Sequence, residues 1–525
     1  MKNKSLSLIA LLLLGFAFAC QQPASKLSNN AFALEEMTIL EMHQRYLDQS
    51  LTVEEVVQQY LNRIEQIDKN GPALNAVIQL NPDALEIARE LDAELREGKV
   101  RGYMHGIPVL LKDNLDTHDK MATTAGSRAL MGSQPLQDSW VAKKLRESGA
   151  VILGKANLSE WANFRGELSS SGWSGVGGQT KNPYVLDRNP CGSSSGSGVA
   201  VSANLCMVAI GTETNGSIVC PSHANGIVGI KPTVGLVSRS GVIPISWTQD
   251  TPGPMARNLS DAAICLAAIS GVDSADTKTL AAKENLHADY QPFLKSNGLQ
   301  GKRLGLYTRA LGTHYKVDAL MQETVDYLKS QGAEIVEIDQ IANPEVESWS
   351  FELMLYEYKD GLNKYFASLG EKATIKNLDE LIAFNKSDSV EMQIYNQVYL
   401  EMANEKEGLD SKAYKDLLQK MENGMRTEGI DRVMNAHQLD AIIAPTGSPA
   451  WKTDWVNGDF YQLGSSSPAA ISGYPNITVP MGFIGELPVG ISFFGRAWSE
   501  PLLLEIASAY EQGTRHRKAP KFLPN

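Results

Sequence analysis

The sequence predicts an α/β protein in which helices cover a central sheet in an α/β/α arrangement. Short apolar runs typical of buried strands lie at residues 107–111, 150–154, 207–211 and 439–446. Helical patterns are interspersed with them, at residues 37–68, 84–97, 317–330 and 502–511. Strands with intervening helices favour a layered protein, because the apolar face of each helix must be buried against a sheet.

The first helical stretch is justified by its capping residues and its period. Thr52 and Glu55 have the spacing of a capping box, in which each side chain satisfies a backbone N–H at the helix start. Val56, Tyr60 and Ile64 then follow at helical spacing. We therefore expect a helix here that packs against the sheet.

The second half of the chain supplies further strands. Two are predicted at residues 302–307 and 333–339, on either side of the 317–330 helix, and residues 477–480 and 489–495 are expected to close the sheet. Residues 340–436 are predicted to be mostly helical, and we expect this section to shape substrate choice.

The composition and charge exclude some classes of partner. The chain has 525 residues, of which 43% are hydrophobic and 21% charged, as is usual for a globular protein. The formal net charge is −12, and no basic stripe is present, so nucleic acid is not expected as a partner. Large α/β proteins can hold one core of this size, and we predict a single domain over residues 37–520.

The N-terminus has the pattern of an export signal. Lys2 and Lys4 precede an apolar run at residues 6–18, and Cys20 follows a small residue. The pattern predicts a signal peptide over residues 1–19, a lipid on Cys20 that anchors the chain to a membrane, and a flexible tether over residues 20–36. Ordinary signal cleavage after the Ala-x-Ala segment is the alternative. Either way, the chain is expected in the cell envelope.

The cysteines and histidines give no metal signal. Cys191, Cys206, Cys220 and Cys265 have apolar neighbours and are expected to be buried free thiols. There is no CxxC pair or Cys/His spacing of a metal site, and the eight histidines are scattered. We therefore expect neither a metal nor a cofactor.

Lys112 follows directly after the apolar run at residues 107–111. One interpretation is a strand-end lysine that reaches out to water. The other is a desolvated lysine, whose lowered pKa leaves a neutral amine able to accept a proton. Lys155 also follows a predicted strand and competes for the same role.

Two small-residue loops dominate the centre of the chain, at residues 191–198 and 212–217. The first contains Ser193 and the second Ser217. Loops of glycine and serine let the backbone approach a substrate closely and direct N–H groups at it. A serine on a tight turn at a strand end is also exposed and well placed to react, provided that a base activates it.

These two loops resemble those of the amidase signature family, whose usual form is GGSSGGS followed by a D-T-G-G-S-type loop. The resemblance runs from about residue 37 to residue 515 and implies one large mixed sheet in one domain. It implies that Ser217 is the nucleophile, that Ser193 is a bridging serine held by a cis peptide, and that Lys112, in a matching K-D-N segment, is the base. In the family the segment of Lys155 is structural.

The resemblance also implies an oxyanion site. The backbone N–H groups of Thr214, Asn215, Gly216 and Ser217 would hold the tetrahedral oxyanion, and Ser194 is assigned to the same oxyanion or substrate-binding group. The chain departs from the family at Asn215, where glycine is commoner; asparagine tolerates a left-handed backbone, so the turn can survive. Ser195 replaces another glycine. Trp173 lies near a segment that forms a pocket wall in the family.

Two other serine hydrolase interpretations are weaker. Residues 192–196 also match the G-x-S-x-G elbow, with Ser194 as nucleophile, but no strand precedes them. His223 lies near Ser217 and could be proposed as its base, although a lone histidine in such a loop is usually structural.

We therefore expect an amidase that hydrolyses a small-molecule or peptide amide to a carboxylate and ammonia. Residues 211–256 resemble in particular the peptide amidases of the family. The alternatives are an A-type subunit of glutamyl-tRNA amidotransferase, and a catalytically silent binding lipoprotein on the same fold.

Overall fold

The computed structural model describes residues 32–371 and 373–525. Residues 36–525 form one compact unit. The predicted signal peptide, Cys20 and most of the predicted tether lie outside the described residues. The predicted domain boundaries at residues 37 and 520 stay a prediction.

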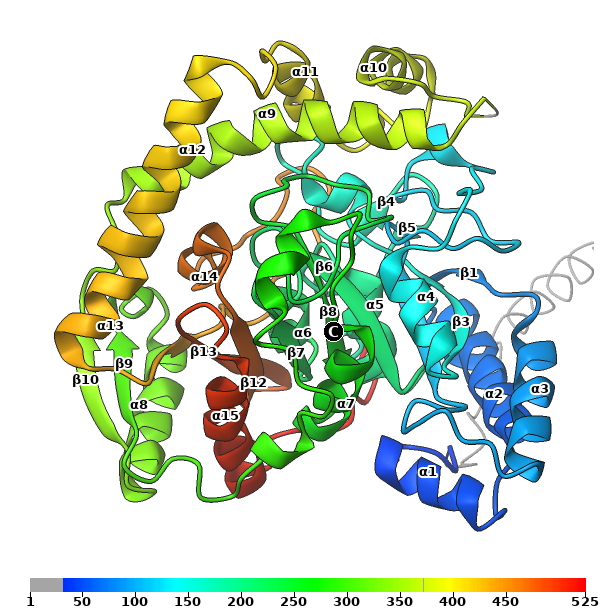
Figure 1. Cartoon of the computed structure of the whole chain (residues 1–525), viewed down its shortest axis with the longest axis horizontal. Helices are drawn as coiled ribbons and strands as arrows, with labels where there is room; N and C mark the ends of the chain where they lie inside the picture. Colours follow the sequence, from blue (N-terminus) through cyan, green and yellow to red (C-terminus); the bar gives the residue numbers. More distant parts are fainter. Residues whose placement is uncertain (1–31, 372) are drawn as a thin grey trace, which may run out of the picture. The chain divides into compact units, whose positions relative to one another are not determined.

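An eleven-stranded mixed sheet forms the centre of the compact unit (Figure 1). Its order is β1-β3-β2-β6-β8-β7-β12-β13-β11-β9-β10. The strands are β1 (Val77–Leu80), β2 (Pro108–Lys112), β3 (Val151–Ala156), β6 (Val208–Glu213), β7 (Val228–Lys231), β8 (Thr251–Ala256), β9 (Arg303–Tyr307), β10 (Glu334–Ile338), β11 (Ala441–Pro445), β12 (Asn476–Ile484) and β13 (Leu487–Phe494). A separate hairpin joins β4 (Trp173–Ser174) to β5 (Gly178–Gln179).

The directions of neighbouring strands bring two candidate site segments to the same side of the sheet. β2 runs parallel to both β3 and β6, whereas β6 pairs antiparallel with β8. The carboxyl ends of β2 and β6, which carry Lys112 and Glu213, therefore lie at the same edge of the sheet. The predicted fold class, a single large α/β domain with a central mixed sheet, is confirmed.

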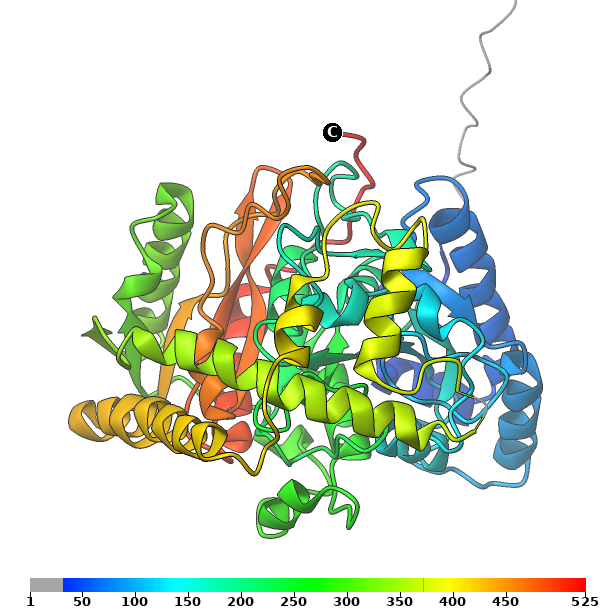
Figure 2. The ribbon, with the colours of Figure 1, turned by 90° about the horizontal axis from the view of Figure 1, so that it is seen from above.

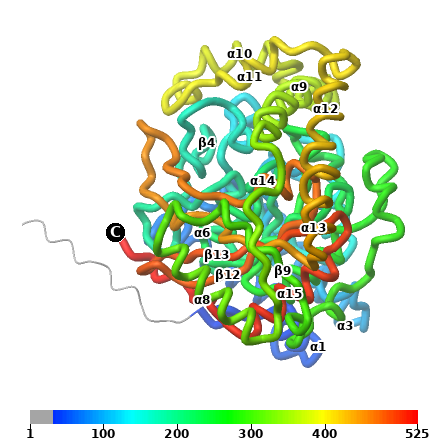
Figure 3. Tube along the Cα trace, turned by 90° about the vertical axis from the view of Figure 1, so that its left-hand side faces the viewer, coloured from blue at the N-terminus to red at the C-terminus, as the bar shows by residue number. Residues whose placement is uncertain are grey.

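Helices surround this sheet. They are α1 (Ile39–Leu47), α2 (Val53–Arg63), α3 (Ala84–Arg96), α4 (Trp140–Glu147), α5 (Ser195–Ser202), α6 (Val219–Ala224), α7 (Leu259–Ile269), α8 (Tyr315–Ser330), α9 (Glu345–Ser368), α10 (Leu378–Ser387), α11 (Val398–Asn404), α12 (Lys412–Met425), α13 (Asp431–His437), α14 (Ser467–Ser472) and α15 (Glu500–Thr514). The predicted capping box is present at α2, where Thr52 accepts from the N–H of Glu55. Both α8 and α15 pack on β12 (Figure 3).

Helix α5 is buried on all sides, which its small residues make possible. It packs against β2, β6 and β8. A Cβ atom at Gly196 would lie 2.3 Å from the carbonyl oxygen of Ala76, so only glycine fits there. The hydroxyl groups of Ser195 and Ser197 donate to the carbonyls of Cys191 and Ile210, at 2.6 and 3.1 Å. The predicted loop at residues 191–198 therefore ends earlier than expected, because its last residues form the first turn of this helix.

Residues 340–436 are mostly helical, as predicted. In Figure 1, α9 runs along the top of the view with α10 and α11 beyond it, and Figure 2 shows α9 crossing in front of the sheet. An aromatic core cluster, which includes Phe164, Tyr358 and Phe366, joins these helices to the segment at residues 161–164. The helical section therefore packs directly against residues 161–164, which precede the first serine loop in the chain.

Candidate active site

Lys112 is the last residue of β2, and its side chain is completely buried. Its Nζ donates to Ser193 Oγ at 2.7 Å, to Thr212 Oγ1 at 2.9 Å and to the Thr212 carbonyl at 3.2 Å. Burial lowers the pKa of Lys112 to about 7, although the charges of Asp250 and Glu213 oppose this shift. The desolvated interpretation therefore fits this residue better than a lysine that reaches out to water.

Ser193 lies directly beside this amine and is itself fully buried. The Gly192–Ser193 peptide bond is cis. The carbonyl of Ser193 accepts from the N–H of Ser159 at 3.0 Å, which ties the loop to the segment after β3. The hydroxyl is consequently held where it can pass a proton to or from Lys112.

Ser217 comes just before α6 and faces a cavity of about 630 Å³. Its carbonyl accepts from the N–H of Ser194 at 3.2 Å, so the two serine loops are bonded to each other. Gly192, Thr214, Asn215 and Gly216 line the same cavity. The structure thus brings both serine loops together at one cavity.

Ser194 plays a different part in the geometry. It is fully buried and does not line this cavity. Its hydroxyl donates to the carbonyl of Thr212 at 3.1 Å and accepts from the N–H of the same residue at 3.2 Å. Ser194 therefore joins the first loop to the end of β6.

The loop at residues 213–217 is held by side chains on several elements. Glu213 accepts from the N–H groups of Ile218 and Val219, at 2.8 and 3.1 Å, and so caps α6. Thr214 Oγ1 donates to Asp250 Oδ1 at 2.6 Å. With its side chains tied in this way, the backbone of the loop has a fixed orientation.

The left-handed residue in this loop is Gly216, not Asn215. Gly216 has a φ of +83°, whereas Asn215 does not adopt positive φ. Instead, Asn215 uses its amide to bond α14 and its cap: Ser466 Oγ donates to Asn215 Oδ1 at 2.7 Å, and Asn215 Nδ2 donates to Ser467 Oγ at 3.3 Å. The asparagine that replaces the family's usual glycine thus makes contacts with Ser466 and Ser467, which the sequence did not predict.

The walls of the cavity come from segments far apart in the chain. The apolar and aromatic lining consists of Ala162, Phe164, Leu168, Ile245, Met354, Tyr399, Trp451 and Tyr461. The sequence analysis missed these residues, because nothing local marks them as neighbours of the serine loops. Trp173 does not line this cavity; its ring packs edge-on against Tyr395, with centroids 5.4 Å apart.

Two alternative bases lie in other surroundings. Lys155 Nζ donates to the carbonyl of Leu115 at 2.7 Å and to Thr123 Oγ1 at 2.9 Å. Burial lowers the pKa of His223 to about 3, and neither of its ring nitrogens has a hydrogen-bond partner among the described residues. These surroundings fit structural roles for Lys155 and His223.

The expectation of four free thiols is wrong for one pair. Cys191 and Cys220 form a disulfide, while Cys206 and Cys265 are free and buried. The two joined cysteines are 29 positions apart in the sequence, and the fold brings them together. Apolar neighbours alone could not distinguish this pair from the other.

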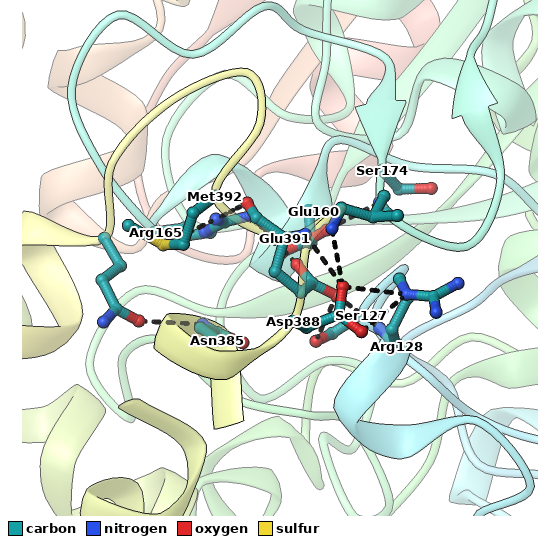
Figure 4. Close-up of polar contacts among 12 residues, drawn as sticks. Ser127, Arg128, Glu160, Arg165, Ser174, Asn385, Asp388, Glu391 and Met392 are labelled. Atoms are coloured by element: carbon teal, nitrogen blue, oxygen red, sulfur yellow. Dashed lines mark hydrogen bonds and ion pairs between the residues drawn. The ribbon is translucent and has the colours of Figure 1, made fainter. Parts of the chain in front are cut away.

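A buried charge cluster supports one wall of the cavity (Figure 4). Arg165 Nη1 donates to Glu160 Oε1 at 2.7 Å and to Glu391 Oε2 at 3.1 Å. Burial, together with the nearby charge of Glu391, raises the pKa of Glu160 well above its usual range. Glu391 also accepts from the N–H of Arg128 at 2.6 Å. The cluster fastens the segment before α11 to the residues that carry the wall.

Metal ligands are not grouped in the part of the chain that the structure describes. No set of three or more His, Cys, Asp or Glu residues there could hold a metal ion.

The comparisons with known proteins decide the family. The family model described as Amidase matches residues 55–504. The chain belongs to the amidase family. "Probable amidase At4g34880" of Arabidopsis thaliana is 43% identical over 508 residues, which cover 94% of this chain and 93% of that protein. The native peptide amidase from Stenotrophomonas maltophilia is 48% identical with a TM-score of 0.90, and the match covers 94% of this chain and all of that one.

A second branch of relatives is also similar. The A-type subunit of the glutamyl-tRNA(Gln) amidotransferase from Microcystis aeruginosa is 33% identical over 505 residues, which cover 92% of this chain and 99% of that protein. The relatives named as amidases are more similar to this amidase than the amidotransferase protein is. Together with the family match, they support an enzyme that hydrolyses amides.

The predicted location in the cell envelope, with a lipid anchor, is wrong. It is contradicted by the curated relatives, which are amidases of a plant and two fungi. Among the described residues, no helix has the length and apolar character needed to cross a bilayer. The prediction rested on residues 1–20, which lie outside those that the structure describes.

Proposed function

We propose that this amidase hydrolyses a carboxamide through a relay of Ser217, Ser193 and Lys112. The observation that carries the proposal is the 2.7 Å hydrogen bond between Lys112 Nζ and Ser193 Oγ, made by a lysine whose pKa burial lowers to about 7. A neutral amine in this position can take a proton from Ser193, which in turn takes one from Ser217.

The acylation step follows from this geometry. Ser217 Oγ attacks the amide carbon as its proton passes through Ser193 to Lys112, and the carbonyl oxygen becomes an oxyanion. Backbone N–H groups of Thr214, Asn215, Gly216 and Ser217 stabilise that charge. When the C–N bond breaks, the proton returns from Lys112 through Ser193 to the leaving nitrogen, because an amine anion is a poor leaving group. Ammonia and a Ser217 ester result.

Deacylation uses the same groups in the same order. A water molecule loses a proton through Ser193 to Lys112 as its oxygen attacks the ester carbon. The bond to Ser217 Oγ then breaks, and the returning proton restores the hydroxyl. The product is a carboxylate, and the enzyme returns to its starting state.

The proposed substrate is the C-terminal amide of a short peptide. The cavity of about 630 Å³ has room for such a molecule, and its aromatic and apolar lining suits peptide side chains. The peptide amidase from Stenotrophomonas maltophilia, at 48% identity, supports the same class. Hydrolysis of glutamine, as in the amidotransferase, is the second candidate, favoured by the relative at 33% identity.

The test is ammonia release from a panel of amides. The panel contains peptide C-terminal amides, aryl amides, fatty amides and free glutamine, and Ser217→Ala is the control. We expect the unmodified enzyme to release ammonia fastest from peptide amides and the control to release none above background. Turnover of glutamine alone would favour the amidotransferase function, and turnover by the control would contradict the role of Ser217.

The pH dependence of kcat/KM is a second test. Lys112 accepts a proton only when neutral, and its pKa is lowered to about 7. The rate is therefore expected to rise about tenfold per pH unit well below this pKa and to level off above it. The measurement is kcat/KM for an uncharged peptide amide across this range, with folding checked by circular dichroism at each pH. A rate that falls as pH rises through this range would contradict a lysine base.

A further inference from the structure

The disulfide between Cys191 and Cys220 joins the two loops that carry the reacting serines. Cys191 lies two residues before Ser193, and Cys220 lies three residues after Ser217. Among the described residues it is the one disulfide. A covalent bond therefore spans the proposed relay from one serine to the other.

The cross-link also forms part of the cavity wall. Both of its cysteines line the cavity that Ser217 faces, and each is about 4% exposed. Trp451 and Ala224 pack against the pair in a small apolar cluster. The disulfide is therefore close to the substrate, yet it supplies no group that takes part in the hydrolysis.

The backbone at Cys191 depends on restraint from its surroundings. Cys191 has a φ of 57°, in the left-handed region that non-glycine residues adopt rarely. Two hydrogen bonds help to hold it: its N–H donates to Asn189 Oδ1 at 2.8 Å, and its carbonyl accepts from Ser195 Oγ at 2.6 Å. The disulfide adds a restraint on the side chain to these two restraints on the backbone.

Cys220, the other cysteine of the pair, is held on the loop that carries Ser217. Its backbone N–H donates to the carbonyl of Gly216 at 2.7 Å, in the first turn after Ser217. A shift of about 1 Å between reacting groups can lower a rate by about 10²-fold. Hydrogen bonds also join the loops, from the Ser194 N–H to the Ser217 carbonyl at 3.2 Å and between the Ser194 hydroxyl and the backbone of Thr212, but none of these bonds involves the hydroxyl of Ser193 or of Ser217.

We propose that the Cys191–Cys220 disulfide positions Ser193 against Ser217, so that amide hydrolysis depends on the redox state of this pair. The inference rests on the proposed function. A small dithiol reduces the pair: its thiolate attacks one sulfur and forms a mixed disulfide, and its second thiol closes on the first. Two protein thiols and one cyclic disulfide result, with two electrons passed to the enzyme.

The test compares the full chain before and after reduction by dithiothreitol, and again after reoxidation. Thiols are counted in denaturant, and kcat and KM are measured with the same peptide amide at a temperature where far-ultraviolet circular dichroism shows a folded chain. We expect a gain of two thiols, a fall in kcat of at least about tenfold with a much smaller change in KM, and recovery on reoxidation.

Two double variants separate this pair from the other cysteines. Cys191→Ala/Cys220→Ala is expected to show the low kcat with or without dithiothreitol, and it provides the unlinked state if the reagent cannot reach the buried bond. Cys206→Ala/Cys265→Ala is the matched control and is expected to keep the full response. A response that is lost in the control instead would overturn the assignment.

Three other results would overturn the proposal. The first is a chain that gains two thiols and keeps its kcat, and the second is a chain whose pair is already free under oxidising conditions. The third is a chain that unfolds on loss of the bond at every temperature tested, because the cross-link then serves stability alone. If the oxidised enzyme hydrolyses no amide, it is the proposed function that fails. The positioning of Ser217 is then measured by the rate at which a sulfonyl fluoride labels it, in place of kcat.

Discussion

Ser217→Ala, Lys112→Met and the double variant are expected to share one residual rate, at least about 10⁴-fold below the kcat of the unmodified enzyme. A nucleophile without its base and a base without its nucleophile are equally ineffective, so the two losses do not add. Methionine fills the volume of the lysine, and its apolar side chain suits a site where Lys112 is completely buried. The measurement is single-turnover and steady-state hydrolysis of one peptide amide by the three variants.

Lys155→Met provides the matched control for this prediction. Lys155 is also buried in a strand of the sheet, β3, but its amine bonds Leu115 and Thr123 and lies 3.9 Å from Asp113. Its removal is expected to lower the melting temperature, because a buried carboxyl group loses its cation, while the folded fraction keeps most of its kcat. A Lys112→Met enzyme that retains more activity than Lys155→Met would contradict the assignment of the base.

Arg165→Met is expected to lower the free energy of unfolding by about 3–5 kcal/mol, the usual cost of removing one partner from a buried ion pair. The guanidinium group is completely buried and bonds two carboxyl groups, those of Glu160 and Glu391. Without it, these groups share a dry site with no cation between them (Figure 4). Urea unfolding followed by circular dichroism measures the loss.

Glu391→Gln is the control for the charge cluster. It leaves one carboxyl group, that of Glu160, for one guanidinium group. The glutamine oxygen can replace only one of the two acceptor oxygens of Glu391, which bond Arg165 and the N–H of Arg128 separately, but the bond from Arg165 to Glu160 remains. Its effect is expected to be well below that of Arg165→Met. Equal losses from the two variants would mean that packing, rather than unpaired charge, accounts for the cost.

The groups of the proposed relay could be named from the sequence, whereas the walls of the cavity could not. Lys112 and Lys155 share one local signal, a lysine at the end of an apolar run, and the resemblance to the family decided between them. The serine loops have a local composition. The cavity lining could not be predicted, because Met354, Trp451 and Tyr461 meet the serines only through long-range packing. The same holds for the Cys191–Cys220 pair, since spacing alone does not fix which cysteines are joined.

The prediction of a cell-envelope location was wrong for a different reason. It rested on the composition of a short segment, and the location of the protein was then inferred from that segment alone. The loop geometry adds a detail that the sequence did not assign: Gly216 carries the positive φ, whereas Asn215, where the sequence departs from its family, does not. The meaning of such a local pattern depends on the rest of the molecule.

The helical section from α9 to α12 lines the cavity but holds none of the three reacting groups of the proposed relay. Its contribution to the cavity comes from Glu347, Met354 and Tyr399, while the proposed relay lies entirely between residues 112 and 217. One part of the cavity wall thus lies in a stretch of the chain separate from the proposed relay, while other wall residues, such as Phe164 and Leu168, lie within the stretch that holds the relay. Recombination that exchanges the helical stretch between relatives is therefore expected to alter part of the wall and to leave the proposed relay in place, which makes this stretch a target for grafting and directed evolution.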